Sequence, residues 1–256
     1  MSVDLFSLKS LLCCLAFFFA GIIDSVCGGG GLITVPTMLA VGIPVHNITG
    51  TNQCSAWVGT GVAAYDYVKS GNIHLRSALI TLPFSMLGSF LGAKLNLMVP
   101  EQYLKMFMIV SIPIISIFLF SNKKLGDVDR VEEKSALSVA VWSAALGFIL
   151  GGYQGFYGPG GGLFYMLAYA ACLKLSLVRA TGNTRFVVAI ASITSVLTYA
   201  LSGMVIWNLA LAATAFNIVG SHLGAMIAIK NGSRVIRPMM FCVIVLLFAK
   251  LISDML

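Results

Sequence analysis

The feature that most constrains this chain is a succession of apolar stretches with only short polar segments between them. The stretches cover residues 5–27, 32–45, 48–68, 75–98, 103–121, 136–157, 160–173, 178–201, 205–229 and 235–253. Most of them approach the roughly 20 residues that a helix needs to cross the ~30 Å hydrocarbon core of a bilayer. Only 10% of the residues are charged and 59% are hydrophobic, so a soluble fold could not cover the apolar side chains. We therefore predict an all-α polytopic membrane protein.

Four landmarks of the first half of the chain recur in the second half in the same order. The matching segments are 29–32 with 160–163, Asn52 with Asn183, 70–71 with 202–203, and 88–93 with 220–225. The offset between the members of each pair is 131 or 132 positions. An ordered set at a nearly constant offset indicates an internal duplication. We predict a first membrane repeat at 1–121, a polar cytoplasmic linker at 122–135 and a second membrane repeat at 136–256.

The distribution of basic residues predicts how the chain is oriented in the membrane. If the apolar stretches alternate in direction, eleven Lys and Arg side chains fall on the side of the linker and four fall on the other side. Because cytoplasmic loops of membrane proteins carry the excess of Lys and Arg, the linker side is predicted to be cytoplasmic. Each half then has an odd number of crossings, so the repeats are expected to be inverted. An eight-span arrangement would make them parallel, and the sequence leaves this alternative open.

Two glycine-rich segments interrupt the apolar regions. One is GGGG at 28–31, shortly after Asp24, and the other is QGFYGPGGG, which begins at Gln154. Such segments break helices, and within a bilayer the freed N–H and C=O groups must be satisfied by protein, water or ligand. A half-helix that starts after the glycines presents free N–H groups and a dipole that favour an anion. We expect broken helices around a central cavity; close helix packing at the glycines is the structural alternative.

A second pair of polar segments, 49–53 and 181–185, ends with a cation in only one half. Arg185 lies in an otherwise apolar run, where an arginine costs ~2.5–3.5 kcal/mol unless it faces a partner or an aqueous cavity. Its planar guanidinium group suits carboxylate, sulfonate or sulfite oxygens. Alternatively, Arg185 pairs with Asp24 or Asp66 and only holds the helices together. Asp24 is our coupling candidate, either as a proton carrier or, beside Arg185, as part of a fixed ion pair.

The candidate substrate-binding residues come from both glycine-rich segments and both polar segments. They are Gly28, Gly29, Gly30, Gly31, Asn52, Gln53, Gln154, Tyr157, Gly160, Gly161, Gly162, Asn183 and Arg185. We expect no metal, because the six cysteines lack ligand spacing, and no nucleotide cofactor, because neither glycine segment follows a strand or precedes Gly-Lys-Ser/Thr. The basic residues are scattered at the ends of apolar runs, so nucleic acid is not an expected partner.

Three segments of this chain resemble the TauE/SafE family of sulfite and sulfonate exporters. They are GIIDSVCGGGGLITVP at 21–36, the GTNQ segment at 50–53 and GFYGPGGGLFY at 155–165. The linker and the Arg-Pro-Met segment at 237–239 are similar to the branch whose members are named probable membrane transporter proteins. The resemblance implies a plasma-membrane carrier for small anions. The chain departs from the family pattern at Gln154, where an acidic residue is common, and at Gln53, where a basic residue is common.

These observations together predict a non-enzymatic secondary transporter that moves a small anion, such as sulfite, a sulfonate or a related organic acid, across the inner membrane. Its expected partners are that anion and the lipid bilayer, and an oligomer is compatible with the sequence. The alternatives are an anion channel, a membrane partner subunit or an intramembrane enzyme. Ser221 and His222 do not support an enzyme, because adjacent residues point about 100° apart on a helix.

Overall fold

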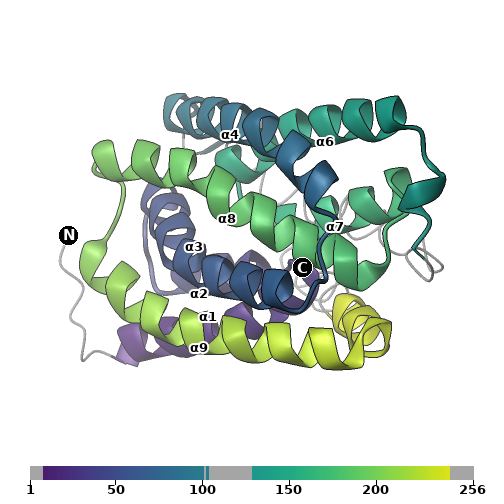
Figure 1. Ribbon diagram of the computed structural model, residues 1–256. Helices are drawn as coiled ribbons and strands as arrows, with labels where there is room; N and C mark the ends of the chain where they lie inside the picture. The colour runs from purple at the N-terminus through teal and green to yellow at the C-terminus, as the bar shows by residue number, and fades with distance from the viewer. Residues whose placement is uncertain (1–7, 101, 104–128, 243–256) are drawn as a thin grey trace, which may run out of the picture.

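The computed structural model describes residues 8–100, 102–103 and 129–242 (Figure 1). Its helices are α1 Leu8–Cys27, α2 Gly31–Ala40, α3 Val45–Lys69, α4 Leu75–Met98, the 3₁₀ helix η1 Val131–Glu133, α6 Ala136–Phe156, α7 Gly161–Cys172, α8 Leu177–Leu201 and α9 Trp207–Asn231. No strand occurs in these ranges. The predicted all-α class is confirmed. Residues 104–121 of one predicted stretch, half of the predicted linker and much of the stretch predicted at 235–253 lie outside the described residues.

Five of the described helices, α1, α4, α6, α8 and α9, are long and apolar enough to cross a bilayer. The chain is therefore a multi-pass membrane protein. Helix α3 has 25 residues, but its polar side chains lower its hydropathy below that of the five. Helices α2 and α7 have 10 and 12 residues, and at 1.5 Å per residue each is only about 15–18 Å long.

The two short helices fold back along the long helices that precede them. On α2, Val35 and Met38 pack in one cluster with Cys13 and Phe17 of α1. In the second half, the Tyr165 hydroxyl donates to the Gly147 carbonyl, 3.2 Å away, so that α7 returns along α6. Positive φ angles between the paired helices, 86° at one glycine of the first break and 89° and 77° at two of the second, make the reversals possible. The predicted helix breaks are therefore present.

The helices of the two halves contact one another reciprocally. Helix α1 packs on α9 and α3 packs on α9, while their counterparts α6 and α8 both pack on α4. Gly220 and Gly224 lie against the backbone of α1, and Gly88 and Gly92 lie against the backbone of α6. A side chain at these glycines would overlap with the neighbouring helix, so they permit the close helix packing that is typical of small-xxx-small spacing. That the two halves superpose as inverted repeats stays a prediction.

Matching hydrogen bonds fix the register between the halves. The Tyr67 hydroxyl donates to Ser25 O at 3.0 Å, and the Tyr199 hydroxyl donates to Gly155 O at 2.9 Å. The Thr51 hydroxyl accepts from Ile206 N at 3.1 Å. In the same way, the side-chain oxygen of Asn183 accepts from His74 N at 2.7 Å. Thr51 and Asn183 therefore make similar contacts, one residue away from the pairing of Asn52 with Asn183 that the sequence suggested.

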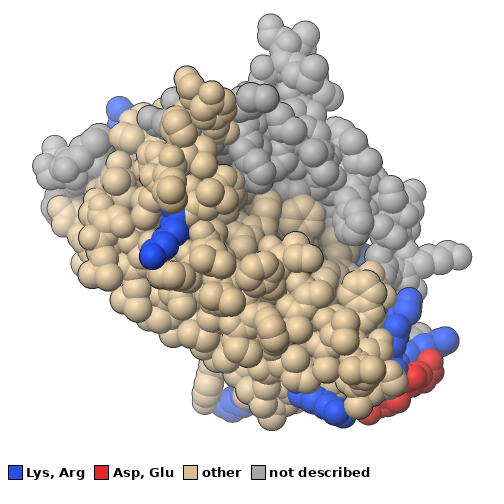
Figure 2. All heavy atoms as spheres, turned by 90° about the horizontal axis from the view of Figure 1, so that it is seen from above, with Lys and Arg blue, Asp and Glu red and all other residues tan. Residues whose placement is uncertain are grey.

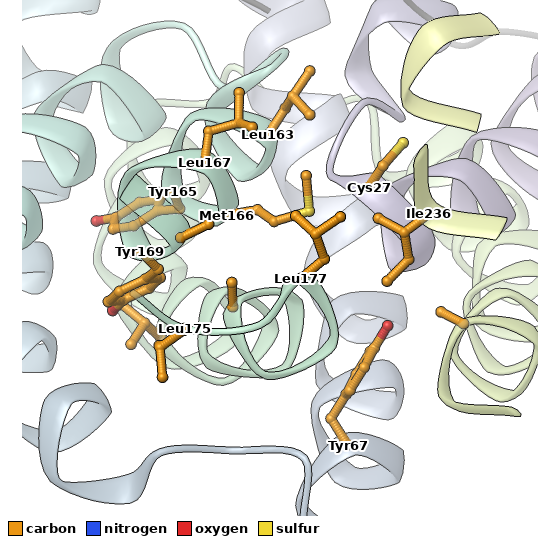
Figure 3. Packing of buried hydrophobic residues seen from close by; sticks show 14 of the residues in the cluster. Cys27, Tyr67, Leu163, Tyr165, Met166, Leu167, Tyr169, Leu175, Leu177 and Ile236 are labelled. Atoms are coloured by element: carbon orange, nitrogen blue, oxygen red, sulfur yellow. The ribbon is translucent and has the colours of Figure 1, made fainter. Parts of the chain in front are cut away.

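The apolar core surrounds the short helix α7. Figure 3 shows Leu163, Tyr165, Met166, Leu167 and Tyr169 of this helix packed together with side chains of other helices. All five have at most 1% of their surface exposed. Because α7 is apolar on all sides and is covered by the longer helices, it is held inside the bundle. Its first residues are consequently fixed near the centre of the protein.

One end of the bundle collects the polar connections. Arg179 at the start of α8 pairs with Asp129 at 2.8 Å and donates to Ile73 O in the turn between α3 and α4. The Arg130 N–H donates to Lys174 O, so the end of the linker lies beside the turn between α7 and α8. Figure 2 shows Lys, Arg and acidic side chains gathered at one edge of an otherwise largely uncharged face. We expect the end that carries these cations to face the cytoplasm.

The orientation can be tested with two exposed serines at opposite ends of the bundle. Ser70 follows α3 at the cation-rich end, and Ser202 occupies the corresponding place after α8 at the other end. In a variant whose six cysteines are replaced, Ser202→Cys should react with a membrane-impermeant maleimide added to intact cells. Ser70→Cys should react only after the cells are opened. Labelling of Ser70→Cys from outside would reverse the predicted orientation.

Candidate functional site

The two glycine breaks meet in the interior of the protein. Leu163 N, in the first turn of α7, donates to Gly28 O across a distance of 3.2 Å. The α-carbon of Gly162 also lies against Gly28, and Gly31 lies against Pro159. There is no room for a side chain at these glycines, so the backbones of the two halves are in direct contact. The start of α2 and the start of α7 are thereby brought to one place.

A pocket lies beside this junction, and both halves of the chain line it. Its lining residues include Asp24, Gly30, Gly31, Thr34, Asn52, Gln53, Trp57, Thr60, Gln154, Gly158, Gly160, Gly162, Arg185, Ser192 and Asn217. The pocket has a volume of about 40 Å³, which is room for a few water molecules. Because polar and charged side chains line it among membrane-spanning helices, it is a place where a hydrated or charged group can be held.

Arg185 supplies the positive charge of the pocket. The residue is only 1% exposed, and its Nη1 group is paired with the carboxylate of Asp24. The other terminal nitrogen, Nη2, lies against the α-carbon of Gly162. Neither Nη2 nor Nε has a hydrogen-bond partner. Because a buried unpaired donor on a charged group is costly, these two N–H groups indicate a missing acceptor.

Asp24 connects Arg185 to the start of α2. One carboxylate oxygen faces Arg185, and the other accepts a hydrogen bond from Gly30 N at 3.2 Å. The Asp24 side chain is 23% exposed, in contrast to the buried guanidinium group behind it. Of the two acidic residues that the sequence offered as partners for Arg185, the structure therefore selects Asp24. Asp66 instead pairs with His222, 2.8 Å away, at the edge of the bundle.

Neutral polar side chains from α2, α3 and α6 complete one wall of the pocket. The Thr34 hydroxyl donates to the Asn52 side-chain oxygen at 2.5 Å. The Gln53 side-chain amide donates to Gln154 O at 2.5 Å, which joins the two halves of the chain. The side-chain oxygen of Gln154 is buried and has no partner. Amide groups at these positions can reorient to donate to an anion or to accept from a protonated one.

The first residues of α2 and α7 also line the pocket. Within the described residues, the N–H groups of Gly31 and Gly162 have no acceptor. They belong to the first residues of α2 and α7, where the dipole of each helix places partial positive charge. Together with Arg185, these helix ends bring positive groups to the pocket, where the Asp24 carboxylate lies beside them. Helix N-termini of this kind are favourable places for anions with oxygen acceptors.

The structure brings together most of the residues that the sequence analysis selected, but not all of them. Gly30, Gly31, Asn52, Gln53, Gln154, Gly160, Gly162, Arg185 and Asp24 line the pocket. Gly28 lies at the junction behind it, and Gly29 and Gly161 are not among the lining residues.

Two further candidates lie away from the pocket. Asn183 is turned away, because its amide is fully engaged by His74 and Ser77. Tyr157 packs in an apolar cluster with Phe17 and Met38.

Sequence analysis missed several polar residues of the pocket. Thr34, Thr60, Ser192 and Asn217 all line it. Asn217 binds the Phe17 carbonyl through its amide nitrogen at 3.0 Å. In the sequence, Asn217 is recognisable only as a polar side chain within an apolar run. Polar residues that serve only in helix packing have the same appearance. Hydroxyl side chains in membrane helices usually bond to their own backbone, so Thr and Ser give still less indication.

The chain is similar to one family over almost its whole length. The pattern of the family described as Sulfite exporter TauE/SafE matches residues 13–251. The chain is 31% identical to the "Probable membrane transporter protein ORF9" of Sinorhizobium sp, covering 93% of this chain and 90% of the relative. It is 30% identical to the "Probable membrane transporter protein YfcA" of Escherichia coli strain K12, covering 98% and 93%. No solved structure was found to match. The chain therefore belongs to the TauE/SafE family of membrane transporters.

Proposed function

We propose that this protein is a secondary transporter that carries a small, singly charged anion across the inner membrane. The anion is sulfite in its monovalent form, a sulfonate or a related organic acid. It binds in the central pocket, where its oxygens accept hydrogen bonds from Arg185 and from the first N–H groups of α2 and α7. Gln53 and Asn52 provide neutral contacts around it.

The observation that supports this proposal most directly is the hydrogen bonding of Arg185. The guanidinium group is 1% exposed, yet its Nε and Nη2 groups have no acceptor. Two adjacent N–H groups of a guanidinium match two oxygens of a carboxylate or sulfonate. Arg185 is also the only cation among the described residues that line the pocket. A single charge of this kind suits a monovalent anion better than a divalent one.

A carrier fits the geometry better than a channel or an enzyme. The pocket of about 40 Å³ has room for one small anion and not for a continuous water-filled pore. Short helices that end near the middle of the bilayer, with their N-termini toward a common site, are typical of secondary transporters. The names of the relatives, which refer to membrane transporters, agree with this class.

Anion binding should stabilise the purified protein. In detergent, the melting temperature should rise with increasing methanesulfonate, bisulfite or formate, because a ligand that binds only the folded state stabilises it by mass action. Chloride at equal ionic strength is the control for salt effects. In proteoliposomes, labelled substrate outside should accumulate when unlabelled substrate is present inside, since such counterflow requires a carrier. A flux without saturation or counterflow would instead indicate a channel, and absence of both binding and flux across the panel would contradict the proposal.

A further inference from the structure

The carboxylate of Asp24 occupies the position that an anion oxygen would take. One of its oxygens faces Arg185 and the other accepts from Gly30 N at the start of α2. These are the two kinds of positive group, guanidinium and helix N-terminus, that the proposed substrate site offers. Asp24 is also the more exposed partner, at 23% against 1% for Arg185. An anion that enters the pocket therefore meets the carboxylate beside the charge that it needs.

The corresponding helices of the other half are joined by an uncharged contact, which is made to a backbone carbonyl instead of to a carboxylate. The matching hydrogen bonds of Tyr67 to Ser25 and of Tyr199 to Gly155 make the residues before these carbonyls, Asp24 and Gln154, counterparts. The register of α3 and α8 likewise makes Gln53 the counterpart of Arg185. Gln53 donates to the Gln154 backbone carbonyl at 2.5 Å, so two uncharged residues connect the corresponding helices.

This comparison shows that the fold does not require an ion pair at such a junction. A buried ion pair is often no more stabilising than a neutral pair, because both charges must leave water. In this protein the ion pair also leaves two guanidinium N–H groups without partners. The Asp24–Arg185 pair is therefore a costly way to join these helices. The Gln53–Gln154 contact indicates that neutral residues are sufficient for that purpose. Its charges are better explained by binding than by folding.

We propose that Asp24 is a tethered substitute for the substrate. When the pocket is empty, its carboxylate neutralises Arg185, and a substrate anion binds by displacing it. This inference rests on the proposed function and adds a role to the same site. An unpaired cation buried within the bilayer is costly, so a carrier with such a cation in its empty pocket is expected to change conformation slowly. Asp24 thus allows the empty carrier to return, whereas the loaded carrier is neutralised by its substrate.

The proposal predicts that Asp24→Asn separates exchange from net transport. Without the competing carboxylate, methanesulfonate should bind about tenfold more tightly or better, as removal of a close charge pair commonly changes affinity by that much. In proteoliposomes, exchange of labelled for unlabelled substrate should persist, because both half-cycles are loaded. Net efflux into substrate-free buffer should fall at least tenfold. Asp66→Asn removes the carboxylate that pairs with His222 at the edge of the bundle, and this control should leave both fluxes unchanged.

One further variant and one further measurement make the result decisive if Asp24→Asn is unstable. The double variant Asp24→Asn with Arg185→Gln removes both charges of the junction, so it should fold with near-normal stability but not bind methanesulfonate. Asp24→Asn alone should regain its lost thermal stability when methanesulfonate is added, because the anion replaces the missing carboxylate. Failure of the anion to restore stability would overturn the inference.

The outcomes also separate this inference from the proposed function. Unchanged affinity and unchanged net efflux in Asp24→Asn would overturn the role of Asp24 while leaving Arg185 as the binding residue. If Arg185→Gln also bound and transported normally, the proposed site itself would be wrong.

Discussion

Replacing Arg185 with glutamine is expected to abolish anion binding and transport while the protein still folds and inserts. Arg185 is the only cation among the described residues of the pocket. In the predicted repeat the place of Arg185 in the first half is taken by Gln53, which donates a hydrogen bond to the Gln154 carbonyl, so we expect glutamine to be tolerated there. Each hydrogen bond to a charged group contributes ~1.5–3 kcal/mol, so the loss of one such bond should lower the affinity by about tenfold to a hundredfold. Thermal shift with methanesulfonate and counterflow in proteoliposomes measure the two effects.

Lysine at the same position should give an intermediate result. Arg185→Lys keeps the charge but loses the planar pair of donors, so binding should weaken without disappearing. Arg179→Gln is the matched control, because Arg179 pairs with Asp129 at the cation-rich end and does not line the pocket. This control should bind normally. Normal binding and transport by Arg185→Gln would show that Arg185 serves only to hold the helices together.

Most of the helix boundaries could be predicted because glycine and polar residues coincide with them. The stretch predicted at 75–98 is α4, and the stretch at 178–201 differs from α8 by one residue. The largest difference concerns α2, which ends at Ala40 instead of near 45. Gly42 has a φ of 87° and Pro44 precedes α3, so the chain turns here although its residues are still apolar. Hydropathy cannot detect a turn that is itself apolar.

The site was only partly predictable because sequence spacing does not reveal contacts between helices. The glycine breaks and Arg185 were recognisable, since each is unfavourable in a membrane helix unless something compensates it. The partner of Arg185 was not, because Asp24 is 161 positions away and Asp66 met the same criteria. Asn183 was selected through a repeat register that is one residue off. On a helix, successive residues are rotated by about 100°. A shift of one position is therefore enough to move a side chain from the pocket to the contact with His74 and Ser77.

The sequence indicated an internal duplication with a cation in only one of its two polar segments, and the charges of the site are asymmetric in the structure as well. The backbone junctions of the two halves use the same hydrogen bonds, as the tyrosines at 67 and 199 show. The charges differ, because only one half has an ion pair and the other has two glutamines. A protein built this way can keep a symmetric scaffold while it binds one charge. The asymmetry is therefore consistent with a single monovalent substrate per carrier.

The second large effect is expected from adding one methyl group at the junction of the glycine breaks. Gly28 has a φ of 86°, and a β-carbon there would overlap with the backbone of Gly162 and Leu163. Gly28→Ala therefore combines backbone strain of about 1–2 kcal/mol with a steric conflict that cannot be relieved by rotating a side chain. We expect a large fall in melting temperature and loss of transport, because α2 and α7 can no longer approach each other.

Gly42→Ala separates the two causes. Gly42 has nearly the same φ, 87°, but no atom lies within 4 Å of a β-carbon built on it. This variant should show the backbone strain alone, with a loss of about 1–2 kcal/mol and normal substrate affinity. The difference between the two variants then measures the contact between the halves at the glycine junction. Equal stability and equal transport in Gly28→Ala and Gly42→Ala would show that the junction can open without cost. In that case, the N-termini of α2 and α7 would not be held at one anion site.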